Sequence, residues 1–357
     1  MQSKVLIIGG GLSGLALAWQ LEQQGVDYLL IEARDRLGGR IHSHQYGEAI
    51  FDLGPSWFWP AQPRIAKLIS ELGLTVFDQY AQGELMYEDE SGNVKSGFGY
   101  SSMQGSYRLE NGLTALIRTI QAKLPKTRYA CNKRATCIKK QDGMISTTIE
   151  NVTESGVQTE TIQSQKVILA LPPRVASTLT YQPALEDKVI LAMQAIPTWM
   201  AGHAKAIVIY KDCFWKTAGL SGDAMSRRGP LVEIHDASPY QIGPYALFGF
   251  VGVPVQYREN NEQQLKQAII EQLVRLFGQA ASQPIEVILQ DWAFEKETAT
   301  KLDHAPLNHH PNYGLTKDLT NLWDDNLLLS STESAPQFGG YIEGALEAAE
   351  LTLHKLS

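Results

Sequence analysis

The first apolar run of the chain, residues 5–8, is short and leads directly into three glycines. A run of this length before such a turn is typical of a buried parallel strand. Apolar side chains then recur with the spacing of one helix face, at Leu12, Leu15, Ala16 and Trp19. The pattern predicts a strand, a tight turn and a helix that ends near Gly25.

Further apolar or alternating runs predict more strands along the chain. They cover residues 28–31, the positions around Ala135 and Ile138, and residues 144–150, 167–170, 198–210 and 327–329. Residues 141–143 have the composition of a turn, and residues 262–277 form an amphipathic pattern that predicts a helix ending at Gly278. We therefore expect an α/β fold.

Composition narrows the class of protein. A length of 357 residues allows about two domains, and 44% apolar with 19% charged residues is ordinary for a globular protein. The net charge of -7 argues against a nucleic-acid partner, and no apolar stretch approaches the roughly 20 residues of a membrane span. Three cysteines without paired spacing predict a protein of the reducing cytoplasm, with no disulfide framework.

The glycine-rich turn carries the first candidate chemistry. Gly9 permits the tight turn, Gly11 lets the backbone approach a pyrophosphate, and Gly14 lets helix and strand pack closely, with Ser13 inside the same turn. The helix N-terminus then offers free N–H groups to a diphosphate. Glu32, eighteen residues beyond Gly14, has the spacing of a carboxylate that binds ribose hydroxyls, and a solvated glutamate is the less favoured alternative.

The next segment, residues 33–40 (ARDRLGGR), resembles the RxGGR segment of the flavin-containing amine oxidases. The resemblance implies a Rossmann-type FAD-binding domain, with Gly39 beside the cofactor, Arg40 near its phosphates and Arg34 as a further contact. Solvated loop cations are the alternative for Arg34 and Arg36. Residues 51–57 (FDLGPSW) resemble the DxGxxW segment of the same family, which leads toward the flavin ring; a plain turn with a core tryptophan is the alternative.

The end of the chain resembles the family's "GTET…GYxEGA" ending, here residues 330–333 and 339–345. The resemblance implies that Glu333 binds hydroxyls of the cofactor and that the backbone at Ile342 faces the pyrimidine end of the flavin. It also places Ala135, where the family more often has valine, against the adenine. The FAD-binding domain would then be discontinuous, with residues 1–75, 125–180 and 322–357, and residues 76–124 and 181–321 would form an inserted α+β substrate-binding domain.

By the same resemblance, Lys205 holds a water against the flavin N5. The alternative is a lysine that faces outward, as most lysines on half-buried strands do. Tyr341 matches one wall of an aromatic cage for the amine, with Tyr313 or His310 as candidates for the other wall. Residues 308–314 lack the cysteine of relatives with covalent flavin, which predicts non-covalent FAD. His304, His309 and His310 favour a loop or pocket over a metal site, so no metal is expected.

The function implied by this resemblance is oxidative deamination of a small amine, with oxygen as acceptor and hydrogen peroxide as product. An L-amino-acid oxidase is an alternative that needs a cation for the substrate carboxylate, for which Arg64 is the candidate. A desaturase-type flavoenzyme and a non-catalytic flavin-binding partner protein are further alternatives. The sequence leaves open which amine is used and what the oligomeric state is.

Overall fold

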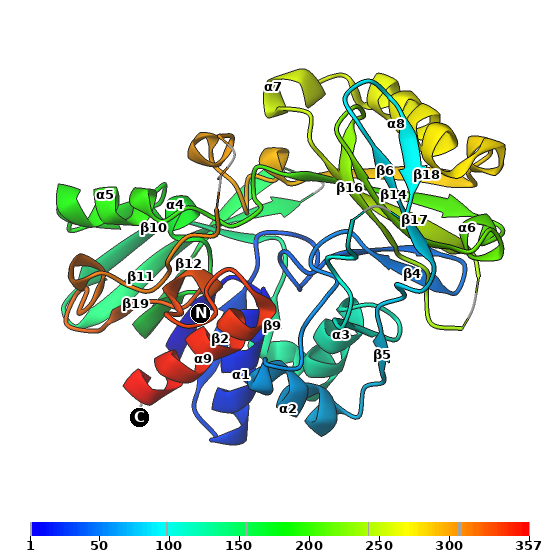
Figure 1. Cartoon of the computed structure of the whole chain (residues 1–357). Helices are drawn as coiled ribbons and strands as arrows, with labels where there is room; N and C mark the ends of the chain where they lie inside the picture. The colour runs from blue at the N-terminus through cyan, green and yellow to red at the C-terminus, as the bar shows by residue number, and fades with distance from the viewer. Residues whose placement is uncertain are drawn as a thin grey trace.

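Two large β-sheets, each with helices packed on it, lie next to one another in the computed structural model (Figure 1). It describes residues 2–97, 99–153, 156–241, 243–305, 307 and 309–356. Both termini belong to the half of the molecule built on the first sheet, and the second sheet is made from the middle of the chain (Figure 1). The chain has an α/β fold, as the sequence predicts.

The first sheet is centred on β1 (Gln2–Ile8), which is parallel to both of its neighbours. Over the described residues this sheet has eight strands, and apart from β1 they are β2 (Tyr28–Ile31), β9 (Tyr129–Ala130), β10 (Lys133–Gln141), β11 (Met144–Thr153), β12 (Gly156–Leu169), β13 (Thr180–Gln182) and β19 (Leu327–Leu329). The long strand β12 belongs to two environments: it pairs antiparallel with β11 near its start and parallel with β1 and β19 near its end. This strand therefore carries the chain from a meander into the parallel part of the sheet.

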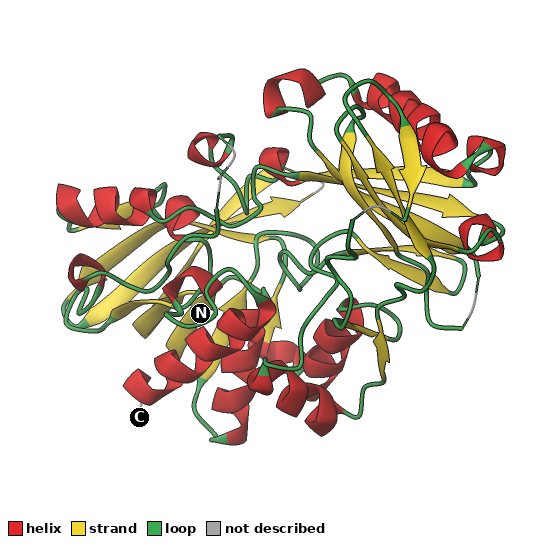
Figure 2. Cartoon of the chain, viewed as in Figure 1, coloured by secondary structure: helices red, strands yellow, loops and turns green. Residues whose placement is uncertain are grey.

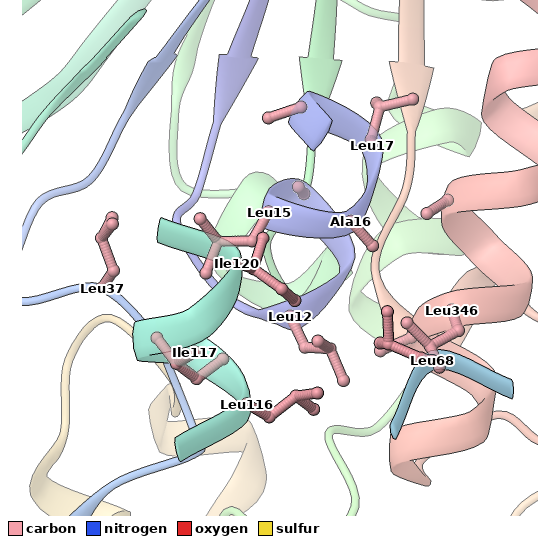
Figure 3. Packing of buried hydrophobic residues seen from close by; sticks show 14 of the residues in the cluster. Leu12, Leu15, Ala16, Leu17, Leu37, Leu68, Leu116, Ile117, Ile120 and Leu346 are labelled. Carbon is pink, nitrogen blue, oxygen red and sulfur yellow. The ribbon is translucent and has the colours of Figure 1, made fainter. Parts of the chain in front are cut away.

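Helices cover both faces of the first sheet. One face is covered by α1 (Leu12–Gln23), α2 (Pro63–Leu72), α3 (Thr114–Lys123) and α9 (Ile342–Leu356), which share one hydrophobic cluster with β1. Figure 3 shows side chains of this cluster, where Leu15 of α1 lies beside Ile120 of α3 and Leu346 of α9 lies beside Leu68 of α2. On the opposite face, α4 (Pro173–Ala176) and α5 (Asp187–Ala195) pack against a second cluster.

The second sheet is mainly antiparallel and dominates its half of the molecule (Figure 2). Its seven strands, counted over the described residues, lie in the order β18 (Glu286–Asp291), β14 (Ala204–Tyr210), β17 (Tyr245–Val251), β16 (Leu231–Asp236), β15 (Leu220–Ser226), β6 (Glu84–Glu88) and β7 (Val94–Ser96). One face packs on α8 (Glu262–Phe277). The other face packs on the hairpin of β3 (Ser43–Tyr46) and β4 (Ala49–Asp52), so β14 is buried from both sides.

The smaller elements connect these layers. They include the hairpin of β5 (Val76–Asp78) with β8 (Tyr107–Leu109) and the short helices α6 (Phe214–Thr217) and α7 (Val255–Arg258). No helix in the described ranges combines the length and the apolar character that crossing a bilayer would require.

Several sequence predictions are confirmed to the residue: strand β2 at 28–31, strand β19 at 327–329, and helix α8 at 262–277 with Gly278 after it. Others need correction. Helix α1 is buried almost all round rather than along one stripe, and Trp19 is only partly buried, because α1 is enclosed by the sheet, α3 and α9. The strand predicted at 198–210 begins only at Ala204.

The predicted domain boundaries also differ from the packing. Helix α3 lies within the range assigned to the substrate domain, yet Leu116 and Ile120 pack against α1. Helix α5 lies in the other range assigned to that domain, yet Val189 and Met193 pack on the first sheet. The apolar faces of these helices pack on the nearest sheet surface that is not already covered. The order of segments along the chain does not show which surface that is.

Candidate active site

The turn after β1 is shaped by glycines that no other residue can replace. Gly9 has a φ of 114°, and a Cβ there would lie 2.4 Å from the carbonyl oxygen of Ala170. A Cβ at Gly14 would lie 2.1 Å from the carbonyl oxygen of Gly9. Gly11 is the N-cap of α1, and no side chain of the described residues caps this helix. The N–H groups of the first helical turn are thus available to an anion.

A second glycine turn lies against the first. Gly38 donates its N–H to the carbonyl oxygen of Gly10 at 2.8 Å, and Gly11 and Gly38 form a parallel bridge. A Cβ at Gly39 would lie only 3.1 Å from the Cα of Gly11. The two turns leave a surface of bare backbone beside the start of α1, which is the shape that a diphosphate requires.

Glu32 follows β2 directly and is held at this surface. Its side chain is buried, with Oε2 accepting the Gly10 N–H at 2.7 Å and Oε1 accepting the Arg34 N–H at 2.9 Å. The solvated alternative for this glutamate is therefore wrong. The Arg34 guanidinium donates to Glu295 at 3.1 Å and to Thr298 at 2.9 Å, and its side chain is 11% exposed. Arg34 is thus not a solvated cation, and it connects the first sheet to the segment after β18.

Arg36 and Arg40 also have defined partners. Arg36 donates to the carbonyl oxygens of Gly39 and Ile41 at 3.1 and 3.4 Å, so its solvated alternative is wrong as well. Arg40 forms a bidentate pair with the fully buried Glu333, at 2.7 and 3.1 Å. Burial alone lowers the pKa of Arg40, but the pair with Glu333 raises the pKa above its ordinary value. The pair joins the glycine turn to the C-terminal motif.

A second connection between the two ends of the chain is made by Ser13, whose hydroxyl donates to the carbonyl oxygen of Ser330. Ser331 is 3% exposed, and its hydroxyl has no partner among the described residues. A buried hydroxyl without a partner is costly. Its place beside Glu333 and Ser13 makes it a natural contact for polar groups of a bound nucleotide.

Lys205 lies on β14 and faces the hairpin of β3 and β4. Its side chain is 6% exposed, and its Nζ donates to the carbonyl oxygen of Gly54 in the DLGPSW segment. The Nζ also lies 5.1 Å from the ring centre of Phe248 and 5.3 Å from that of Phe250. Burial lowers the pKa of Lys205 from 10.5 to about 8, although nearby Asp52 opposes the change. The alternative of an outward-facing lysine is therefore wrong.

Gly54 places Lys205 next to the surface of bare backbone that the two glycine turns form at the start of α1, which we call the nucleotide cradle. A Cβ at Gly54 would lie 1.9 Å from the carbonyl oxygen of Arg40, so the two backbones are in direct contact. Trp292 donates its indole N–H to the carbonyl oxygen of Leu53 at 3.1 Å. The buried lysine and the cradle thus meet through the segment of residues 53–54. No local pattern in the sequence indicates that this carbonyl is the lysine's partner.

The aromatic residues predicted as a cage are arranged differently from the expectation. His310 stacks on Tyr341, with ring centres 4.9 Å apart and planes 19° apart, and meets the ring of Tyr313 edge-on at 5.4 Å. The Tyr313 hydroxyl donates to the carbonyl oxygen of Pro197 at 2.8 Å. Stacked rings leave no room for an amine between them, so His310 does not act as an opposite wall.

The second ring that Tyr341 contacts is Trp59, at 6.4 Å and nearly perpendicular. Tyr341 is 38% exposed, so part of its ring is open. Asn308, which belongs to the loop predicted to border the flavin, lies outside the described residues. Trp59 and Tyr341 thus form a corner of two rings, and Tyr313 stays a candidate for the opposite wall.

The structure also shows the surroundings of three more residues that the sequence analysis considered for the site. Ile342 begins α9, and N–H groups of a first helical turn have no acceptor inside the helix. Ala135 lies in β10 at an irregular register, after residues 132–133 that hydrogen bond to the backbone of Arg34 and Glu32. Arg64 pairs with Glu343 at 3.4 Å and with Glu350 at 2.7 Å, so it ties α2 to α9.

Two of the histidines considered as metal ligands, His304 and His310, have other contacts. His304 contacts the carbonyl oxygen of Ala293 at 3.2 Å, and His310 belongs to the aromatic group. In the part of the chain that the structure describes, no three His, Cys, Asp or Glu side chains are grouped to hold a metal ion. The three cysteines are free thiols.

Comparison with known proteins gives two matches to family models. Residues 7–72 match the model described as NAD(P)-binding Rossmann-like domain, and residues 84–352 match the model described as Flavin containing amine oxidoreductase.

Individual relatives agree with these models. The chain is 23% identical to a probable flavin-containing monoamine oxidase A of Dictyostelium discoideum over 96% of this chain and 95% of the relative. It is 26% identical to a putrescine oxidase of Kocuria rosea over 62% of this chain and 50% of that protein.

Solved structures show the same fold. A putrescine oxidase bound to putrescine superposes with a TM-score of 0.81 at 18% identity, over 100% of this chain and 99% of that chain. A cyclohexylamine oxidase from Brevibacterium oxydans superposes with a TM-score of 0.80 at 18% identity, over 99% and 98%.

Proposed function

The chain belongs to the flavin-containing amine oxidoreductase family, and from that premise we propose that it oxidises a small amine with non-covalently bound FAD and oxygen as acceptor. The observation that carries the proposal is the buried Lys205, which reaches the Gly54 carbonyl beside the nucleotide cradle. The products would be an imine, which water hydrolyses to a carbonyl compound, and hydrogen peroxide.

The residues of the cradle fit a dinucleotide cofactor. Bare glycine backbone and the uncapped start of α1 suit a diphosphate, and Glu32 suits ribose hydroxyls. Arg40, Glu333 and the hydroxyl of Ser331, which has no partner in the part of the chain that the structure describes, lie at the junction with the C-terminal motif. When bound, FAD supplies the acceptor for the hydride equivalent that leaves the carbon next to the amine nitrogen.

Lys205 would act by holding a proton and a hydrogen bond at one atom, Nζ. Its low pKa lets the side chain exchange a proton near neutral pH. A positive Nζ also disfavours an ammonium ion in the same place, so the amine would react as the neutral base. The rings of Phe248 and Phe250 beside Nζ exclude water and strengthen both effects.

The structure bears on one rival function. An L-amino-acid oxidase needs a cation for the substrate carboxylate, and the candidate Arg64 is already neutralised by Glu343 and Glu350. The guanidinium ties two helices together instead of facing the Lys205 side of the cradle. This favours a substrate without a carboxylate.

The test begins with the absorption spectrum of the purified protein, followed by denaturation to see whether FAD is released. Anaerobic addition of amines should bleach the flavin absorbance, and readmitted oxygen should restore it with one hydrogen peroxide formed per amine oxidised. Bleaching without recovery in air would refute oxygen as the acceptor. A flavin that no amine bleaches would refute amine oxidation and favour a desaturase or a flavin-binding partner protein.

A matched pair of variants tests the part played by Lys205. Lys205→Met should slow flavin reduction or reoxidation, whereas Lys95→Met, at an exposed position of β7, should change neither. Equal rates in both half-reactions for Lys205→Met and the unchanged protein would remove Lys205 from the mechanism.

A further inference from the structure

A groove lies between the loop that follows β2 and the segment that follows β18. Its volume is about 390 Å³, and its lining includes Arg34, Arg36 and His42 from the loop and Phe294 and Lys296 from the segment. Pockets for small molecules begin at about 300 Å³, so the groove has room for a ligand larger than a single ion. None of the glycines of the nucleotide cradle lines it, so it is a separate site from the surface that suits a diphosphate.

Most of the negative charge in the groove is already neutralised. Glu295 pairs with the Arg34 guanidinium at 3.1 Å, and Glu297 pairs with Arg134. Asp35 is the third carboxylate of the lining, and it is exposed, so water screens its charge. These three carboxylates therefore do little to balance any further cation in the groove.

Two cations of the groove have no carboxylate of their own. Arg36 donates from one guanidinium nitrogen to the carbonyl oxygens of Gly39 and Ile41, and its other nitrogens have no acceptor among the described residues. Lys296 is exposed, and no ion pair within the described part of the chain includes it. A partly buried guanidinium without an anion is unfavourable, and its remaining N–H groups have the planar arrangement that binds two oxygens of a phosphate.

The ionisable groups around Arg36 respond to this positive charge. Burial, followed by the charge of Arg36 and that of Arg34, lowers the pKa of His42 to about 4, although Glu295 opposes the change. Burial and the charge of Arg34 also lower the pKa of Arg36, against the effect of nearby carboxylates. An anion in the groove would relieve the part of both changes that comes from neighbouring cations.

The rim of the groove offers an aromatic surface. The Phe294 side chain is 45% exposed, and its ring meets that of His304 at 6.0 Å between ring centres. A planar ring placed against Phe294 would lose apolar surface to water and gain a favourable ring contact. The volume of the groove leaves room for such a ring beside an anionic group on Arg36.

The residues that would bind the anion also shape the nucleotide cradle. Arg36 donates to the carbonyl oxygen of Gly39 at 3.1 Å, and a Cβ at Gly39 would lie 3.1 Å from the Cα of Gly11. The backbone carbonyl of His42 accepts the Gly54 N–H at 3.2 Å. A guanidinium held by an anion has fewer conformations than one that is free to move, so the anion would make this turn more rigid.

We propose that this groove binds a phosphate monoester that carries a ring, with the phosphate on Arg36 and Lys296 and the ring against Phe294, and that the bound phosphate stabilises the adjacent glycine turn. The inference goes beyond the proposed function, because it concerns a ligand other than the substrate and the cofactor. Only its effect on FAD rests on that function. By linkage, a ligand that makes the turn more rigid slows the loss of FAD, and bound FAD strengthens the binding of the ligand.

The experiment titrates FAD-bound protein with adenosine monophosphate and with ribose 5-phosphate in a calorimeter. FAD-bound protein is used because adenosine monophosphate resembles half of FAD and would also enter an empty cradle. Arg36→Met and Lys296→Met each remove one charge from the groove, and Phe294→Ala removes the ring. Arg118→Met is the matched control, because this exposed arginine also donates to a carbonyl oxygen, that of Asn111, and lies outside the groove.

We expect adenosine monophosphate to bind more tightly than ribose 5-phosphate, and Arg36→Met and Lys296→Met each to weaken both about tenfold, as for one lost charged hydrogen bond. Phe294→Ala should remove the difference between the two ligands, and Arg118→Met should change neither affinity. Saturating ribose 5-phosphate, at constant ionic strength, should slow the release of FAD in dilute urea, followed by flavin fluorescence. The same concentration should have much less effect on FAD release from Lys296→Met.

Three results would overturn the inference. If neither ligand binds the FAD-bound protein, or if Lys296→Met leaves their affinities unchanged, the groove is not a phosphate site. If the ligands bind and FAD is released at the same rate, the effect on the glycine turn is refuted. Lys296 is exposed and does not contact the turn, so its variant gives the answer even where Arg36→Met fails to retain FAD. Amine oxidation is tested separately, by the bleaching of the flavin with amines.

Discussion

Replacing Lys205 by methionine tests whether burial lowers the pKa of this side chain. The test uses the free energy of unfolding as well as the reaction rate. Burial lowers the pKa of Lys205 from 10.5 to about 8, which is a depressed value for a base. The unfolded chain therefore binds this proton more tightly than the folded protein does. A pKa difference of this size corresponds to about 3 kcal/mol in the free energy of unfolding. The folded protein is less stable by this amount below pH 8 and regains the stability as the pH rises toward 10.5.

Methionine has no charge, so the variant lacks this pH dependence. Relative to Lys205→Met, the free energy of unfolding of the unchanged protein should rise by about 2 to 3 kcal/mol between pH 7.5 and pH 10.5. Other groups titrate in both proteins and cancel in the difference. Urea unfolding, followed by tryptophan fluorescence at several pH values, measures it. Flavin-free protein is used, because a bound cofactor adds its own binding free energy.

The control is Lys95→Met, which removes an exposed lysine of β7 and should give a difference that stays flat over this range. A flat difference for Lys205→Met too would show that the lysine is hydrated or already fully charged in the folded protein. The reasoning that burial poises this side chain near neutral pH would then be wrong.

Three further substitutions test contacts in the cradle and near it. Arg40→Met leaves the buried Glu333 without its cation and should cost about 3 kcal/mol of unfolding free energy in urea, with part recovered when Glu333→Gln is added; an unchanged stability would contradict the pairing. Gly54→Ala places a Cβ against the Arg40 carbonyl and should lower the FAD content of the purified protein, whereas full FAD occupancy would contradict the close approach. Tyr313→Phe should cost about 1 kcal/mol by removing the donor to Pro197, and a large loss of activity with normal stability would instead place Tyr313 against the substrate.

The sequence predicted those elements whose pattern lies within a few neighbouring residues. The run at residues 327–329 is apolar on both sides, as a buried strand requires, and Gly278 ends α8 where the amphipathic pattern stops. The glycine turn and Glu32 were found because their spacing along the chain reflects one βαβ unit.

Contacts between distant segments could not be found in this way. Arg36 stands out in the glycine-rich segment, but its place in the same groove as Lys296 depends on how the segment after β18 packs. Likewise, the stacking of His310 on Tyr341 depends on how two loops pack. Side-chain partners of this kind follow from long-range packing, which no local periodicity encodes.

The hydrophobic cluster around α1 has a consequence for biosynthesis. Leu15 near the start of the chain packs in the same cluster as Leu346 and Ala349 near its end. While the chain is still being made on the ribosome, α1 emerges long before α9, and its apolar surface has no complete partner. The first βαβ unit can therefore complete its packing only after α9 has been made, so part of the apolar surface of α1 stays uncovered during most of synthesis.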